Sequence, residues 1–260
     1  MSSVVDELAE PQIHEVKISD FYGGDVFFAQ EEPIFQQPIA LLLFANRSGS
    51  NLLAEHLLAS GRFSGLQETL NYENVEDVSR RHGVKSFPQY VRAIAAHNMR
   101  HGIFGTKCSL GQLAMLLRWN ILSMFSGAKI INIERRDVVS QAVSMSIASQ
   151  TESWSSDVPP TGDPVYRFDE IEKYFTHFTG DVIKRRILID LLEIDARTFE
   201  YDEVVSKPFE VVSECCGLFG VPVPEGVPER TRLKKQGGAL NQEYSARFRQ
   251  DLRRRLLHRT

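Results

Sequence analysis

Short apolar runs alternate with segments of helical period along most of the chain. Runs rich in Ile, Val and Leu have the length and composition of strands buried on both faces of a parallel sheet, and they occupy residues 39–45, 102–107, 129–135 and 196–201. Between them, apolar residues recur every three or four positions, which predicts helices over residues 50–59, 87–100, 110–125, 138–151, 168–192, 207–219 and 242–257. This order predicts an α/β fold of three layers, with a central parallel sheet flanked by helices.

One domain accounts for most of the chain. Residues 1–37 are mixed in character and rich in Glu, Gln and Pro, so we expect a loosely packed N-terminal extension there. Residues 38–260 contain no internal repeat, no low-complexity tract and no strong linker, which favours a single domain. The clearest loop is the segment 153–164, which is rich in Ser, Pro, Asp and Gly.

The composition is that of a compact soluble protein, with 42% hydrophobic and 25% charged residues. No stretch approaches the roughly 18 to 20 apolar residues of a membrane span, and the first residues lack the pattern of a secretory signal. We therefore expect no transmembrane segment and a cytoplasmic location. The three cysteines (Cys108, Cys215 and Cys216) and seven histidines have none of the spacings of a metal or redox site. We expect buried cysteines and no metal.

Positive charge is concentrated at the C-terminal end. The net charge is −4, yet residues 230–260 hold ten Lys or Arg and two acids. Such a segment is either a solvated basic helix or a cover for an anionic ligand. Binding to nucleic acid is a third alternative, but Tyr244 and Phe248 are the only aromatics there that offer stacking platforms, so we expect no nucleic acid partner.

The sequence FANRSGSNLLAEHLL, residues 44–58, passes from a buried strand through a small polar turn into a helix. Backbone N–H groups and the positive end of the helix dipole converge at such a turn, which suits an anion such as phosphate. Arg47 adds a planar cationic fork. The alternative is an ordinary capping turn. The loop has neither the Walker A pattern nor Gly-x-Gly-x-x-Gly. The candidate ligands of the anion are Arg47, Ser48, Gly49, Ser50 and Asn51.

A second anion signal follows the strand at 129–135. Arg136 lies at the carboxyl edge of this strand, where ligands of open α/β sheets bind. Ser144 is eight residues further along the next helix, and Asp137 is a candidate N-cap of that helix. We expect Arg136 and Ser144 to reach one phosphate.

Together these residues resemble sulfotransferases that use 3′-phosphoadenosine 5′-phosphosulfate (PAPS). The paired signature is Arg-Ser-Gly-Ser after the first strand and Arg-x7-Ser after a later one; in that family the first loop holds the 5′-phosphosulfate and the second pair holds the 3′-phosphate. The run RRDVVSQAVSMSIASQTESW is similar to bacterial carbohydrate sulfotransferases of the trehalose 2-sulfotransferase type. The resemblance implies a P-loop NTPase-like fold, PAPS as cosubstrate without a metal, a carbohydrate or glycolipid acceptor, and a homodimer.

The resemblance also implies roles for residues elsewhere. SGLQETL resembles the segment that carries the family's proposed catalytic glutamate, which makes Glu68 the best match for the base and leaves Glu73 and Glu55 as alternatives. His56 on the first helix is a further alternative, although its spacing favours packing. FGTKCS resembles a Gly-Lys strand whose Lys107 would reach the sulfuryl group. EYSARFRQDL resembles the C-terminal segment that covers PAPS, together with the candidate ligands Lys235, Gln236, Arg247 and Arg249.

Two other functions fit parts of the pattern. A P-loop kinase or other nucleotide phosphotransferase would also place phosphate at the first loop, but the Lys-Ser/Thr pair that positions a magnesium nucleotide is missing. A non-catalytic protein that binds PAPS or its product PAP is the second alternative. The sequence therefore predicts an in-line sulfuryl transferase, with these two readings left open.

Overall fold

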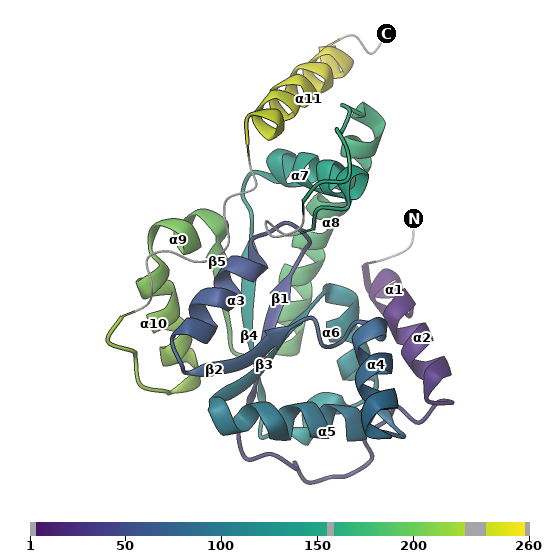
Figure 1. Cartoon of the computed structure of the whole chain (residues 1–260), viewed down its shortest axis with the longest axis vertical. Helices are drawn as coiled ribbons and strands as arrows, with labels where there is room; N and C mark the ends of the chain where they lie inside the picture. Colours follow the sequence, from purple (N-terminus) through teal and green to yellow (C-terminus); the bar gives the residue numbers. More distant parts are fainter. Residues whose placement is uncertain (1–3, 155–158, 227–237, 258–260) are drawn as a thin grey trace.

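The computed structural model describes residues 4–154, 159–226 and 238–257. A single parallel sheet of five strands crosses it, in the order β2-β3-β1-β4-β5 (Figure 1). The expected three-layer α/β fold with a central parallel sheet is confirmed. The strands are β1 (Ile39–Phe44), β2 (Phe63–Gln67), β3 (Ile103–Cys108), β4 (Ala128–Glu134) and β5 (Ala196–Glu200).

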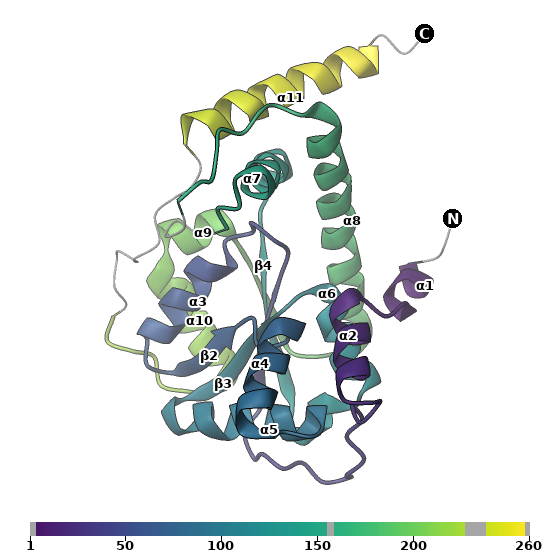
Figure 2. The same ribbon diagram turned by 45° about the vertical axis from the view of Figure 1, so that its right-hand side comes forward.

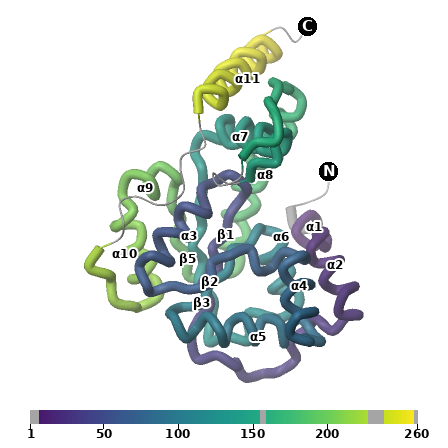
Figure 3. Tube along the Cα trace, viewed as in Figure 1, coloured from purple at the N-terminus to yellow at the C-terminus, as the bar shows by residue number. Residues whose placement is uncertain are grey.

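Helices cover both faces of the sheet, and the Cα trace in Figure 3 follows the same path. Three predicted helices have the bounds expected from the sequence, namely α3 (Ser50–Ala59), α7 (Val138–Thr151) and α8 (Phe168–Leu192). The others are α1 (Val4–Ala9), α2 (Ile13–Phe21), α4 (Tyr72–His82), α5 (Phe87–Asn98), α6 (Leu110–Arg118), α9 (Tyr201–Ser206), α10 (Pro208–Phe219) and α11 (Ala239–Leu257), with short 3-10 turns η1 (Met99–His101) and η2 (Ile121–Met124).

The central strand β1 separates two hydrophobic cores. Its alternate side chains Leu41 and Leu43 join a core that also contains residues of α2, α5, α6 and α8, whereas Leu42 and Phe44 face α3 and α10. All six residues of β1 are buried. A strand buried on both faces must be apolar throughout, which is why its run was evident in the sequence.

Two elements near the edge of the sheet were missed by the sequence analysis. Strand β2 has the composition Phe-Ser-Gly-Leu-Gln, too short and too polar for a recognisable run. Its Gly65 has φ +77°, and a Cβ there would overlap the carbonyl oxygen of Gly105 on β3, so the close approach of the two strands requires glycine. Helix α4 was missed because it buries only Val75 and Ser79.

Other expected bounds need correction. The helix expected over 110–125 ends at Arg118, because Asn120 adopts a left-handed conformation with φ 56° and a separate 3-10 turn follows.

The N-terminal extension is not loosely packed. Ile18, Tyr22, Val26 and Phe28 are buried in the same core as β1. The buried Glu15 accepts from Arg118 Nε at 2.8 Å, which anchors α2 to α6.

The C-terminal helix α11 is a packed element and not a free basic helix. It lies across α7 and α8, as Figures 1 and 2 show from two directions. Phe248 is fully buried, and Tyr244 packs with it in a third hydrophobic cluster. Within the described ranges, no helix is long and apolar enough to cross a membrane.

Candidate functional site

Three strands bring the expected catalytic residues to one edge of the sheet. The order β2-β3-β1 makes β3 the common neighbour, and parallel strands end on the same side. Glu68 directly follows β2, Lys107 is the penultimate residue of β3, and the loop 45–49 follows β1. Leu42 of β1 is in register with Lys107. The topology therefore explains why residues far apart in the sequence meet here.

Two residues of the loop between β1 and α3 have left-handed backbone conformations. Arg47 has φ 64° and Gly49 has φ 98°. A Cβ at Gly49 would overlap the ring of Tyr201, so glycine is required by both conformation and space. Ser48 is 1% exposed, and among the described residues its hydroxyl has no hydrogen-bond partner. A buried unsatisfied hydroxyl at a helix N-terminus fits a phosphate or sulfuryl oxygen.

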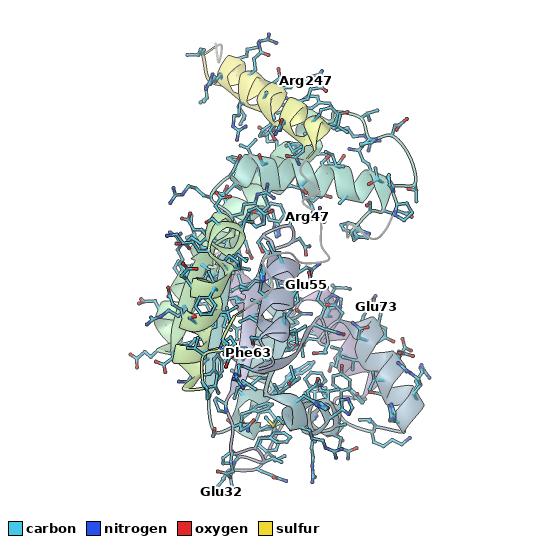
Figure 4. The ribbon with its side chains drawn as sticks, turned by 60° about the vertical axis from the view of Figure 1, so that its left-hand side comes forward. Glu32, Arg47, Glu55, Phe63, Glu73 and Arg247 are labelled. Carbon is cyan, nitrogen blue, oxygen red and sulfur yellow. The ribbon has the colours of Figure 1, made fainter. Side chains whose placement is uncertain are left out.

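Arg47 spans the loop and the helix that follows β4. Its Nε donates to the Ser144 hydroxyl at 3.0 Å, and its Nη1 donates to the Trp154 carbonyl oxygen at 2.8 Å. Arg135 donates from Nη1 to the Arg47 carbonyl oxygen at 3.4 Å. Burial, and then the positive charge of Arg135, lower the pKa of Arg47. Two like charges brought together in a partly buried site favour an anionic ligand. Figure 4 shows Arg47 above the start of α3 and facing α7.

Lys107 is the centre of a buried polar cluster. Its side chain is 4% exposed, and Nζ donates to Glu68 Oε1 at 2.7 Å and to Asn51 Oδ1 at 2.5 Å. The same nitrogen lies 4.5 Å from the centre of the Phe44 ring. Burial lowers the pKa of Lys107, and Glu68 opposes this. Burial raises the pKa of Glu68, but the charge and hydrogen bond of Lys107, the hydrogen bond of Asn71 and the charge of His14 together outweigh it, so the net pKa of Glu68 lies below its ordinary value.

The second carboxylate oxygen of Glu68 is held from the other side. Asn71 Nδ2 donates to Glu68 Oε2 at 3.0 Å, and Gln112 Nε2 donates to Asn71 Oδ1 at 2.8 Å. Gln112 also closes the capping box of α6 with Ser109. Neither Asn71 nor Gln112 has a signal in the sequence, because their role depends on contact between α4, α6 and the end of β2. Glu68 is therefore fixed in position, yet its side chain is still 40% exposed.

Arg136 and Ser144, which we expected to reach one phosphate, have separate partners in the structure. Arg136 is 79% exposed and pairs with Glu200 at 3.0 Å, whereas Ser144 receives its hydrogen bond from Arg47. Arg135 is the arginine at the loop, with its guanidinium 5.1 Å from the centre of the Tyr201 ring. Neither Arg135 nor Tyr201 was singled out in the sequence. The tandem Arg-Arg was the available signal, but it does not tell which arginine turns toward the loop.

The other candidates are dispersed. Glu73 is 67% exposed near Lys17, and Figure 4 shows it projecting from α4, well away from Arg47. Glu55 lies on α3, and the buried His56 on the same helix has a pKa lowered by burial and then raised in part by Glu55. Packing is the simplest role of His56.

Arg247 and Arg249, two candidate ligands in the basic C-terminal segment, both have partners in the structure. Arg249 pairs with Asp137, the N-cap of α7, at 2.7 Å. Arg247 lies 4.0 Å from the centre of the Tyr166 ring. Lys235 and Gln236 lie outside the described residues. In the part of the chain that the structure describes, no three His, Cys, Asp or Glu side chains form a metal-binding group. All three cysteines are buried and free.

Three solved sulfotransferase structures are similar to this chain. The sulfotransferase domain from the curacin biosynthetic pathway is 18% identical, with 80% of this chain and 82% of that chain covered and a TM-score of 0.49. The sulfotransferase domain of the Synechococcus PCC 7002 olefin synthase is 17% identical, with coverage of 85% and 91% and a TM-score of 0.45. A sulfotransferase from Alicyclobacillus acidocaldarius is 18% identical, with coverage of 86% and 97% and a TM-score of 0.43.

A comparison with curated proteins gives no match. A family model described as Stf0 sulphotransferase matches residues 40–251, which include β1 from Ala40 onward, the loop 45–49, Glu68, Lys107 and α11 as far as Asp251. That match spans most of the chain, and it contains β2 to β5 completely and β1 from its second residue. The chain therefore belongs to the Stf0 sulphotransferase family and is a sulfotransferase.

Proposed function

We propose that the protein transfers the sulfuryl group of PAPS to a hydroxyl of a carbohydrate or glycolipid. Family membership implies PAPS as the donor. The acceptor class rests on the resemblance of the α7 region to carbohydrate sulfotransferases. The observation that carries the proposal is the cluster of Asn51, Lys107 and Glu68 beside a loop with a buried, unsatisfied Ser48 hydroxyl. We also propose a cytoplasmic location and a homodimer, on the same resemblance.

The donor would be held at the first loop and at α7. When bound, PAPS supplies a sulfuryl group on a phosphate leaving group. The backbone N–H groups of Ser48 to Asn51 and the guanidinium of Arg47 would bind its 5′-phosphosulfate, which neutralises charge as the leaving group departs. We propose that Ser144, with Arg136 or the neighbouring Arg135, binds the 3′-phosphate. Lys235 and Gln236 would complete the cover, in the segment before α11.

Glu68 would serve as the general base. The acceptor oxygen forms a bond to sulfur while the sulfur bond to the leaving phosphate oxygen breaks, and the hydroxyl proton passes to the Glu68 carboxylate. Lys107 and Asn71 hold both carboxylate oxygens in place, and partial exposure leaves Glu68 accessible to an acceptor. Lys107 also places a positive charge where the sulfuryl oxygens would lie.

The test combines one variant with two binding measurements. Glu68→Gln is expected to lower kcat by about 10² to 10⁴ with unchanged affinity for PAP by calorimetry. Glu73→Gln and Glu55→Gln are the matched controls, and each is expected to keep wild-type kcat. If the protein prefers ATP with magnesium to PAP, it is a phosphotransferase; if PAP binds tightly but no sugar or glycolipid is sulfated, it is a binding protein.

A further inference from the structure

The N-terminal helix α2 borders the cluster around Glu68 although it lies outside the family match. The match begins at residue 40, whereas α2 ends at Phe21. Helix α2 contacts both α4 and α6, and Figure 2 shows it running beside these helices. Asn71 is the N-cap of α4, and Gln112 lies in the first turn of α6. Asn71 donates a hydrogen bond to Glu68 and accepts one from Gln112, so the two residues together hold Glu68. An element outside the family match therefore adjoins a site that lies within it.

Two residues at the start of α2 make the closest contacts with this region. His14 Nδ1 accepts a hydrogen bond from the backbone N–H of Tyr72 at 3.0 Å. Tyr72 is the first residue of α4, directly after Asn71. Gln12 packs on Gly111 in the first turn of α6 so closely that a Cβ on Gly111 would overlap it. The segment 12–14 is thus seated on the starts of both helices.

The bond from Tyr72 fixes which nitrogen of His14 can donate. Because Nδ1 is an acceptor here, the neutral ring carries its hydrogen on Nε2. The side chain is 31% exposed, and among the described residues no acceptor is paired with Nε2. A directed N–H donor therefore lies next to the turn that contains Glu68 and Asn71, with its orientation set by a backbone contact.

We propose that His14 is a specificity residue for the acceptor, donating from Nε2 to a hydroxyl of a neutral, polyhydroxylated molecule. This inference rests on the proposed function. The carboxylate of Glu68 accepts the reacting hydroxyl's proton, and the N–H of His14 binds a neighbouring hydroxyl, so the two groups together orient a ring with several hydroxyls.

The charged groups around His14 are already paired, which suits a neutral acceptor. Glu73 Oε2 lies 4.0 Å from His14 Nδ1, and Glu68 follows β2 a few residues before α4. Burial raises the pKa of Glu68, whereas Lys107, Asn71 and a protonated His14 lower it, so His14 and Glu68 lie within electrostatic reach of each other. Glu73 is paired with Lys17 at 3.8 Å and Glu68 with Lys107 at 2.7 Å, so neither carboxylate leaves a charge that calls for an ionic ligand. Their oxygens can still accept hydrogen bonds from sugar hydroxyls.

Two substitutions separate recognition of the acceptor from support of α4. In His14→Asn the amide oxygen can replace Nδ1 and retain the bond from Tyr72, but no donor replaces Nε2. In His14→Gln the longer amide can replace Nε2, but the bond to Tyr72 is lost. We expect His14→Asn to raise KM for the acceptor about tenfold, with unchanged Tm and PAP affinity. We expect His14→Gln to lower Tm and retain an acceptor KM closer to that of wild type.

The assay uses the full chain, labelled PAPS and a panel of glucose, maltose and trehalose, with calorimetry of PAP in parallel. Lys17→Ala, on the same helix and paired with Glu73, is the control and should keep wild-type KM. If wild type sulfates a sugar but His14→Asn has the same KM, His14 only supports α4 and the inference is wrong. If wild type binds PAP but neither binds nor sulfates these neutral sugars, the neutral acceptor is wrong and the inference with it. If wild type does not bind PAP, the proposed function itself is refuted.

Discussion

Replacing Lys107 by methionine would test whether the buried cluster of Lys107, Asn51 and Glu68 sets the pKa of Glu68. Methionine fills similar volume next to Phe44 but removes the ammonium that Glu68 and Asn51 share. At 2.7 Å the gross Coulomb attraction is about 6 kcal/mol with an effective dielectric constant of about 20, and about 1.5 kcal/mol in water. Because 40% of the Glu68 side chain is exposed, screening brings the value toward the lower limit.

The cost of burying the ammonium offsets part of that attraction. We therefore expect Lys107→Met to lose about 1 to 2 kcal/mol of unfolding free energy, or about 2 to 8 °C in Tm. The effect on turnover should be larger, with kcat lower by about 10² to 10³, because the charge that we propose stabilises the sulfuryl group is lost. Lys129→Met is the matched control, since Lys129 pairs with Asp195 at the opposite end of the sheet.

The pH dependence gives the sharper measurement. In wild type the pKa of Glu68 is net lowered: burial raises it, and Lys107, followed by Asn71 and His14, together lower it further than burial raises it. The stability from this pair is therefore fully present above the pKa of an unfolded glutamate and is lost as pH falls through the lower folded value. In Lys107→Met burial acts without that partner, so the pKa of Glu68 rises and the acidic limb of kcat/KM moves to higher pH. An unchanged acidic limb, together with an unchanged dependence of Tm on pH between about 3 and 7, would refute this reasoning.

Other substitutions test the anion site. Gly49→Ala should lower PAP affinity at least about tenfold, because the left-handed φ and the Tyr201 ring both exclude a Cβ; Gly217→Ala, in open space on α10, should bind PAP as wild type does and serves as its control by calorimetry. Arg135→Ala should weaken PAP binding more than Arg136→Ala, since Arg135 contacts the loop and Arg136 is paired on the surface; the reverse order in the same titration would restore the assignment made from the sequence.

Much of the fold could be predicted because the strands that matter most are the most apolar. Strand β1 is buried on both faces, so its sequence permits few alternatives, and the turn and helix after it follow from Gly49 and from the periodicity of α3. Strand β2 lies at the edge and includes Ser and Gly, and helix α4 is mostly solvated, so neither has a strong local pattern. Both are stabilised by neighbours that are distant in the sequence.

The sequence by itself determined the sheet's central strands, the anion loop and the residue types needed for sulfuryl transfer. Only the tertiary structure decided which of these residues meet. The strand order brings Glu68 and Lys107 together, and the end of β4 turns Arg135 toward the loop. It also seats His14 beside α4, although the composition of the N-terminal segment predicted loose packing. The physical reason is that strand and helix patterns report local burial, whereas a site depends on long-range contacts that no local pattern records.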